Sequence, residues 1–289
     1  MKNNLRLSGI SFLLLGSHFL SAATNLEQFS TKSVEQLTPA NGRLVGTLDI
    51  RPSDVFKEND SFRFENSVSI GYRFPYPLQI LYQQEIWTNL SNSPALPGPA
   101  QGTVFARDGY ISVLADKFWI AEDNKAYLTY EARTYLSTFS VRRAAGMISA
   151  VRNYLTIGHK LGPGATVSLT ETPIMHFFSQ DSYKGKANPV FENRLQAKAT
   201  FQLTQNLTFG LPLIWQVTKM RQSPGASKSG IWDHYIWINP ELFYSLDSHY
   251  SVGMAYYDLG SLTRGDLSDL TIMEGLRDGV VQFIFKASL

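Results

Sequence analysis

The last eleven residues, GVVQFIFKASL (Gly279 to Leu289), alternate strictly between two kinds of side chain. Neighbouring side chains of a strand point to opposite faces, so this stretch predicts a strand with two different faces. One face is apolar and holds Val281, Phe283, Phe285, Ala287 and Leu289. The other face holds Val280, Gln282, Ile284, Lys286 and Ser288. Soluble domains commonly end in a frayed polar tail, whereas here the apolar face runs to the final residue, so we expect something to bury it.

The same alternation recurs along the chain, in segments 43–51, 62–74 and 191–203. The last of these is the clearest. Its apolar face holds Phe191, Leu195, Ala197, Ala199, Phe201 and Leu203. Its polar face holds Glu192, Arg194, Gln196, Lys198, Thr200 and Gln202. Each such segment therefore predicts a strand with one apolar and one charged face.

Short turns alternate with long polar connections between these segments. The short turns are expected at 75–77, 121–125, 162–164, 204–206 and 247–249. The long connections are expected near 52–60, 89–107, 137–146, 179–190, 220–231 and 258–275. This pattern predicts about twelve strands with both chain ends on the short-turn side. An even strand number, with short turns at one end and long loops at the other, is typical of bacterial outer-membrane barrels.

Strand length favours a membrane barrel over a soluble sheet. Strands of globular proteins average roughly five residues, whereas the segments here span about ten to thirteen, enough for a tilted strand to cross a bilayer. Every backbone N–H and C=O must be paired in lipid, and a closed barrel achieves this. We therefore predict an all-β fold, a closed antiparallel transmembrane β-barrel of about twelve strands with short periplasmic turns and longer extracellular loops.

The N-terminus predicts export. Residues 1–23 combine a basic start, an apolar run and a small-residue site, the features of a cleaved secretory signal peptide. We expect cleavage after Ala23, a short periplasmic segment at 24–40 and the barrel at 41–289. A transmembrane helix needs about 18 consecutive apolar residues, and no later stretch of the sequence approaches this length.

Charge and cysteine content exclude several protein classes. Cleavage would remove Lys2 and Arg6 but no acid, which changes the formal charge from +2 to zero. A nucleic-acid-binding protein needs a concentrated basic face, so we expect no nucleic-acid partner. The chain has no cysteine, so the core or a membrane must hold the exported protein together.

Two kinds of residue conflict with the simple alternation. Asp116 lies in a poorly alternating segment, GYISVLADKFWI, and its orientation is open. A register that places Thr170 and Thr172 inside sends Glu171 outward, where a carboxylate at mid-depth is unfavourable. Three prolines fall inside expected strands and interrupt the hydrogen-bond ladder, so we expect bulges to absorb them: Pro173, Pro212 and Pro240.

Taken together, the signal at 1–23 and the terminal strand VQFIFKASL resemble those of the Gram-negative outer-membrane β-barrel superfamily. The resemblance implies an outer-membrane location and recognition of the terminal strand by the barrel-assembly machinery. That terminal signal usually ends in Phe, whereas this chain ends in Leu289. Relatives with twelve strands include acidic-oligosaccharide porins, a nucleoside channel and an outer-membrane phospholipase. No motif selects between the first two.

Two arrangements of residues would suggest an enzyme. The phospholipase places its nucleophilic Ser two residues after its base His, a spacing that His249 and Ser251 reproduce, although no Asn-Gly follows. An outer-membrane protease needs Asp and His at the outer mouth, where we expect His176, Asp181, Asp233 and His234. Bare spacing is weak evidence, so we expect no catalytic activity, and no motif for a metal or a cofactor is present.

The expected lumen carries the functional prediction. Eleven charged residues are expected to line it: Arg63, Glu65, Arg73, Glu131, Arg133, Arg152, Glu192, Arg194, Lys198, Glu241 and Lys286. They predict a channel for passive diffusion of small hydrophilic solutes with a weak preference for anions. A plugged structural barrel, with its role in the loops at 89–107 and 258–275, is the alternative, and a hydrolase is a third.

Several expected loops are basic. Their cations are Arg142, Arg143, Lys184, Lys186, Lys219, Arg221 and Lys228. If these loops are extracellular, their cations could bind lipopolysaccharide phosphates through charge-assisted hydrogen bonds. A solvated loop surface explains them equally well.

Overall fold

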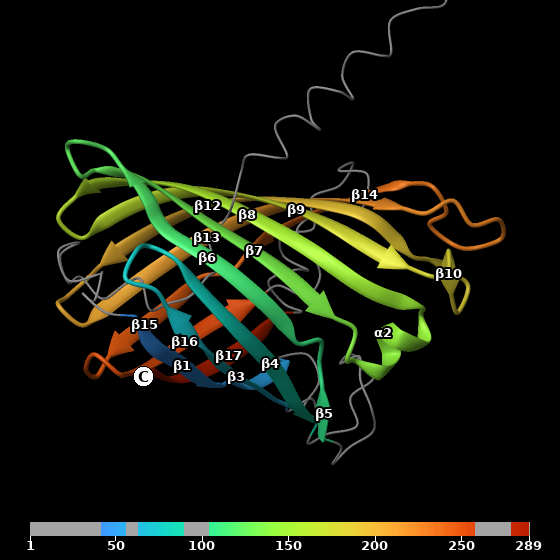
Figure 1. Ribbon diagram of the computed structural model, residues 1–289, viewed down its shortest axis with the longest axis horizontal. Helices are drawn as coiled ribbons and strands as arrows, with labels where there is room; N and C mark the ends of the chain where they lie inside the picture. The colour runs from blue at the N-terminus through green and yellow to red at the C-terminus, as the bar shows by residue number, and fades with distance from the viewer. Residues whose placement is uncertain (1–41, 56–62, 90–103, 258–278, 289) are drawn as a thin grey trace, which may run out of the picture.

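The computed structural model describes residues 42–55, 63–89, 104–257 and 279–288 (Figure 1). The expected signal peptide at 1–23 and segment at 24–40 lie outside these residues, as do the loop at 258–275 and most of the loop at 89–107. The strands are β1 (Arg43–Ile50), β2 (Pro52–Val55), β3 (Arg63–Arg73), β4 (Gln79–Asn89), β5 (Val104–Ala106), β6 (Tyr110–Ile120), β7 (Ala126–Leu136), β8 (Met147–Gly162), β9 (Ala165–Phe178), β10 (Ser182–Tyr183), β11 (Lys186–Ala187), β12 (Pro189–Gln202), β13 (Leu207–Met220), β14 (Trp232–Ile238), β15 (Glu241–Ser245), β16 (Tyr250–Tyr257) and β17 (Val280–Ser288). A short helix, α2, spans Ser140–Ala144.

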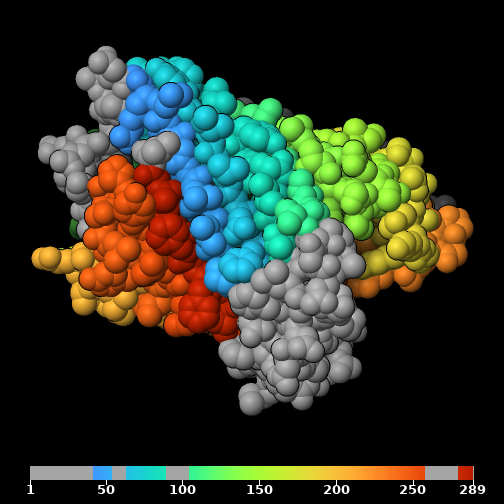
Figure 2. Space-filling view, turned by 90° about the horizontal axis from the view of Figure 1, so that it is seen from below, coloured from blue at the N-terminus to red at the C-terminus, as the bar shows by residue number. Residues whose placement is uncertain are grey.

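The strands form a closed antiparallel barrel of twelve, as the sequence predicted. Three of the twelve are built from two consecutive segments, β1 with β2, β5 with β6, and β14 with β15. The last strand closes the barrel, because β17 pairs with both β1 and β2, for example Ala287 with Leu48 and Val280 with Val55. Figure 2 shows the surface of β17 directly beside that of β1.

The two ends of the barrel differ as expected. The five predicted short turns join β3 to β4, β6 to β7, β8 to β9, β12 to β13 and β15 to β16. The helix α2 and the β10–β11 hairpin lie at the opposite end (Figure 1). Positive φ values occur where a tight turn requires them, at Asn124 and Gly164. No helix in the described part of the chain is long and apolar enough to cross a bilayer.

Burial is inverted relative to a soluble sheet. In β3, Ser67 and Ser69 are buried, whereas Val68 is 46% exposed and Ile70 is 63% exposed. The same inversion occurs in β17, where Gln282 and Lys286 are buried and Phe283 is exposed. Covering a large apolar side chain is worth about 1.5–3 kcal/mol, so these outward rings and aliphatic chains require a covering that water does not provide. A bilayer supplies it.

The segment around Asp116 contains a bulge. The pairing of β6 with β7 shifts between Ala115 and Trp119, and Lys117 has a φ of 44°. The shift brings two groups to one hydroxyl, because Thr129 Oγ1 bonds both the Lys117 N–H and a carboxylate oxygen of Asp116. The bulge therefore explains why polar and apolar residues do not alternate regularly in this segment.

The prediction of bulges at all three prolines is wrong. Pro173 lies opposite Asn193, and Pro212 lies opposite Lys198, both in unbroken register. Each proline forfeits a single ladder hydrogen bond, which long neighbouring strands tolerate. Pro240 instead falls between β14 and β15 and separates the two segments.

The strand β9 adopts the register that places Thr170 and Thr172 inside and Glu171 outside, although a carboxylate is unfavourable on the outer face. Thr170 and Thr172 are buried, and the Thr170 hydroxyl bonds that of Thr156 at 2.7 Å. Glu171 therefore occupies the outer face of β9. The expectation that a mid-depth carboxylate avoids this face is therefore wrong, and the side-chain amide of Asn193 donates a hydrogen bond to it there.

Candidate lumen site

All eleven predicted lumen residues occupy the inward parity of their strands. Contacts across strands that are not neighbours establish this direction. Gln282 on β17 donates to Glu65 on β3 at 2.8 Å, and Lys198 on β12 pairs with Glu241 on β15. These side chains can meet only on the concave side of the wall.

Three of the seven lumen cations are neutralised by a carboxylate on the same strand. Arg133 pairs with Glu131 at 2.7 Å and Arg194 with Glu192 at 2.6 Å. Arg63 pairs in the same way with Glu65. In each case one residue separates the partners along a strand, a spacing that places both on one face. The spacings Arg-x-Glu and Glu-x-Arg were visible in the sequence and could have identified the pairs.

Lys198 and Glu241 form an ion pair that spans an intervening strand, β13. Two small or compact residues of β13 lie beneath it, Pro212 opposite Lys198 and Gly210 opposite Glu241. A Cβ atom on Gly210 would stand 2.6 Å from Oε1 of Glu241. The missing side chain therefore leaves the room in which Glu241 extends toward Lys198.

Two lumen arginines contact neutral groups. Arg73 donates through Nε and Nη2 to the amide oxygen of Gln79, at 3.1 and 2.9 Å. Arg152 lies over the ring of Tyr135, 4.2 Å from its centroid. These contacts leave more of the positive charge uncompensated than a carboxylate would.

Aromatic rings hold several guanidinium groups, and sequence reasoning missed them. Arg133 lies between the rings of Tyr110 and Tyr154, at 4.6 and 4.7 Å. Arg107 lies in the same way between Trp87 and Phe139, at 4.1 and 4.5 Å. Such stacking favours one orientation of the flexible arginine side chain. The signal was available for β7 and β8, because Tyr135 shares the inward parity of Arg133, and Tyr154 that of Arg152.

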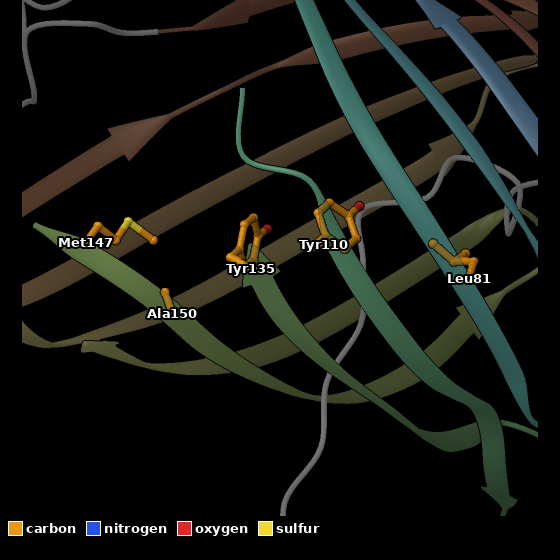
Figure 3. Packing of buried hydrophobic residues seen from close by; sticks show 5 residues of the cluster. All are labelled: Leu81, Tyr110, Tyr135, Met147 and Ala150. Carbon is orange, nitrogen blue, oxygen red and sulfur yellow. The ribbon is translucent and has the colours of Figure 1, made fainter. Parts of the chain in front are cut away.

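An apolar cluster lines one side of the loop end of the lumen beside these arginines. Figure 3 shows its side chains, which come from four neighbouring strands: Leu81, Tyr110, Tyr135, Met147 and Ala150. All five are buried, and Phe178 packs against them. The side chains of the cluster project into the lumen and narrow it near its loop end.

The connection between β7 and β8 adds to this narrowing. Phe139 is buried, and its ring stacks on that of Phe105 with centroids 5.6 Å apart. Asp108 fixes the connection, because it accepts the Phe139 N–H at 3.0 Å and pairs with Arg142 at 3.0 Å. The loop is therefore tied inward by a buried carboxylate.

The residues of the enzyme alternatives are held by separate partners. His176 lies 3.8 Å from Glu192, and Asp181 pairs with Arg221. Asp233 bonds Lys228 and Tyr235, while the ring of His234 stacks on Trp215. In the turn before β16, Nδ1 of His249 contacts the carbonyl oxygen of Ser288 at 3.0 Å. None of these contacts assembles a base, a nucleophile and an oxyanion site.

Four of the seven basic loop residues are engaged locally. Arg142, Arg221 and Lys228 have carboxylate partners, and Lys219 donates to the Gly230 carbonyl at 2.6 Å. Partial burial of Lys228 opposes its charge, but hydrogen bonds to Asp233 and Tyr235 raise its pKa overall. The exposed cations of the set are Arg143, Lys184 and Lys186.

No family profile and no curated protein sequence matches this chain. Solved structures of two outer-membrane proteins are similar in fold. The NanC porin aligns over 84% of this chain and 98% of its own, with 11% identity and a TM-score of 0.53. The COG4313 outer membrane channel from Pseudomonas putida F1 aligns over 90% and 100%, with 10% identity and a TM-score of 0.57. The chain therefore has the twelve-stranded fold of the outer-membrane β-barrel channels.

Proposed function

We propose that the protein is an outer-membrane channel for passive diffusion of small hydrophilic solutes, with a weak preference for anions. One observation carries the proposal, the closed barrel whose inner wall bears charges of both signs with bases in excess among the eleven lumen residues. Porins use such walls to select solutes electrostatically. The fold shared with the NanC porin and the COG4313 channel supports this function.

The mechanism follows from which charges are compensated. The pairs of Arg133 with Glu131 and of Arg194 with Glu192 present little net field to a passing ion. Arg73 contacts an amide and Arg152 a ring, and Glu192 compensates part of the Arg152 charge, so Arg73 contributes most to a longer-range field. The small excess of uncompensated positive charge would give the channel a weak preference for anions.

A narrow conduction path is part of the proposal. The apolar cluster and Phe139 restrict the loop end of the lumen to solutes that are small or that move these side chains aside. Hydrophobic constrictions of this kind also gate by excluding water.

The second candidate is a plugged barrel that acts through its loops. Burial of the ion pairs favours it, since the side chain of Glu131 is only 2% exposed. In this case the exposed Arg143, Lys184 and Lys186 are the cations that would bind lipopolysaccharide phosphates.

Single-channel recording in planar bilayers separates the two functions. We expect discrete conductance steps, and a reversal potential under a salt gradient that indicates slight anion selectivity. Arg194→Ala and Lys198→Ala should shift this potential in a channel but alter only stability in a plugged barrel. A correctly folded barrel that stays silent would reject the channel and direct attention to the loops.

A further inference from the structure

The outer wall carries a patch of polar side chains in the middle of its membrane-facing surface. The outer-wall patch consists of Tyr130 on β7, Asn153 on β8, Glu171 on β9 and Asn193 on β12. Their strands are consecutive around the barrel. All four have the parity of exposed apolar neighbours such as Leu169 and Met175, and all are half-buried.

The patch lies at mid-depth. Glu171 is six residues from the first residue of β9 and seven from the last. Across the ladder it faces Leu155 on β8 and Leu195 on β12. Lipid headgroups and water are therefore far from it along the strand, and acyl chains offer no hydrogen-bond partner.

Hydrogen bonding within the patch is incomplete. Asn193 donates to Glu171 at 3.3 Å, and Tyr130 donates to Asn153 at 3.4 Å, both long for such bonds. The side-chain oxygen of Asn193 is buried and has no partner. Polar groups in this state destabilise a lipid-facing wall, so another protein surface is the covering that this patch fits.

We propose that the outer-wall patch is the contact surface between two copies of this chain in the membrane. The patch contains donors and acceptors together, amides and a hydroxyl beside a carboxylate. A surface of this kind is complementary to itself across a two-fold axis, as an isologous dimer requires. Polar side chains hydrogen-bond across interfaces between membrane segments in the same way.

Disulfide trapping tests the proposal directly, because the chain has no native cysteine. Leu169→Cys places a thiol two residues from Glu171 on the same face of β9. Leu48→Cys is the matched control on the opposite side of the barrel, with 43% exposure against 46%. Met175→Cys replaces Leu169→Cys if that variant does not fold. Oxidation of whole outer membranes should trap a species of twice the monomer mass at the β9 sites and not at Leu48.

A second set of variants shows whether the polar groups hold the contact. Leu169→Cys combined with Glu171→Leu and Asn193→Leu should keep the heat-dependent gel shift of a folded barrel and lose roughly nine-tenths of the trapped dimer. Leu169→Cys with Glu171→Gln should retain it. Equal trapping at Leu48 and Leu169, no trapping at any β9 site, or trapping that the leucine variants leave unchanged would overturn the proposal. A cross-linked product of another mass would also overturn it, because the partner would then be a different membrane protein.

Discussion

Lys198 and Glu241 lie on strands separated by a third and still form a buried ion pair, with side chains 7% and 13% exposed. The pair joins the β12 and β15 regions of the wall above the backbone of β13. Because it is buried, removal of one partner leaves the other charge without compensation. Its energetic importance is therefore larger than that of a surface salt bridge.

Neutralisation of one member should destabilise the barrel strongly. We expect Lys198→Met to lower the free energy of unfolding by about 3–5 kcal/mol. The double variant Lys198→Met with Glu241→Gln should lose less than Lys198→Met alone, because no unpaired charge remains. Urea unfolding of the refolded protein in lipid vesicles measures both. Additive losses in the double variant would contradict a direct coupling.

Gly158 in β8 should not tolerate a side chain. A Cβ atom there would lie 2.1 Å from the ring of Tyr127, whereas one on Gly162 in the same strand would meet nothing within 4 Å. We expect Gly158→Ala to lower the free energy of unfolding by about 1–3 kcal/mol. Gly162→Ala, the matched control, should stay within about 0.5 kcal/mol of the parent. Equal effects of the two substitutions would mean that Tyr127 moves away freely.

Shortening of the apolar cluster should widen the conduction path. If the channel proposal holds, Tyr110→Ala and Tyr135→Ala should each raise single-channel conductance by roughly two-fold or more, since both rings lie in the narrow part of the lumen. Tyr82→Ala removes an exposed ring from the outer face of β4 and serves as the control. Unchanged conductance in all three variants would place the narrowest point elsewhere.

Asp247 should give the turn before β16 a dependence on pH. The backbone N–H of His249 and that of Tyr250 donate to its carboxylate and lower its pKa. A depressed folded-state pKa stabilises the folded state above the unfolded value, about 3.9, and this contribution is lost as the pH falls through the folded value. The unfolding midpoints of the parent and Asp247→Asn should therefore differ at neutral pH and converge in strong acid. A gap of constant size would exclude Asp247 as its source.

Alternation and turn spacing were sufficient to predict the barrel from the sequence. A strict period of two over long segments is typical of strands with two different faces. The strand β17, which also alternates, closes the barrel against β1 and β2. Inward parity likewise followed from the pattern for all eleven charged residues. The pattern did not predict which of these residues form buried ion pairs, and therefore not how they would act on a solute.

The failures have physical causes. Local rules penalise proline in a strand, but neighbours as long as β9 and β12 keep Pro173 and Asn193 in register. A carboxylate on the outer wall was considered unfavourable because lipid is a poor partner, and a donor from an adjacent strand, Asn193, was not foreseen. Arg107 and its rings were missed because they come together only when β4, β6 and the β7–β8 connection are folded.

The hydrogen bond from Gln282 to Glu65 joins groups that lie 217 residues apart in the chain. Nearly the whole polypeptide must be synthesised before this bond and the neighbouring β1–β17 ladder can form. Until then the sheet has two open edges, each able to capture a strand from another molecule. We therefore expect closure of the ring, a non-local step, to be slow. A chain truncated before β17 should keep two open sheet edges that pair with strands of other molecules.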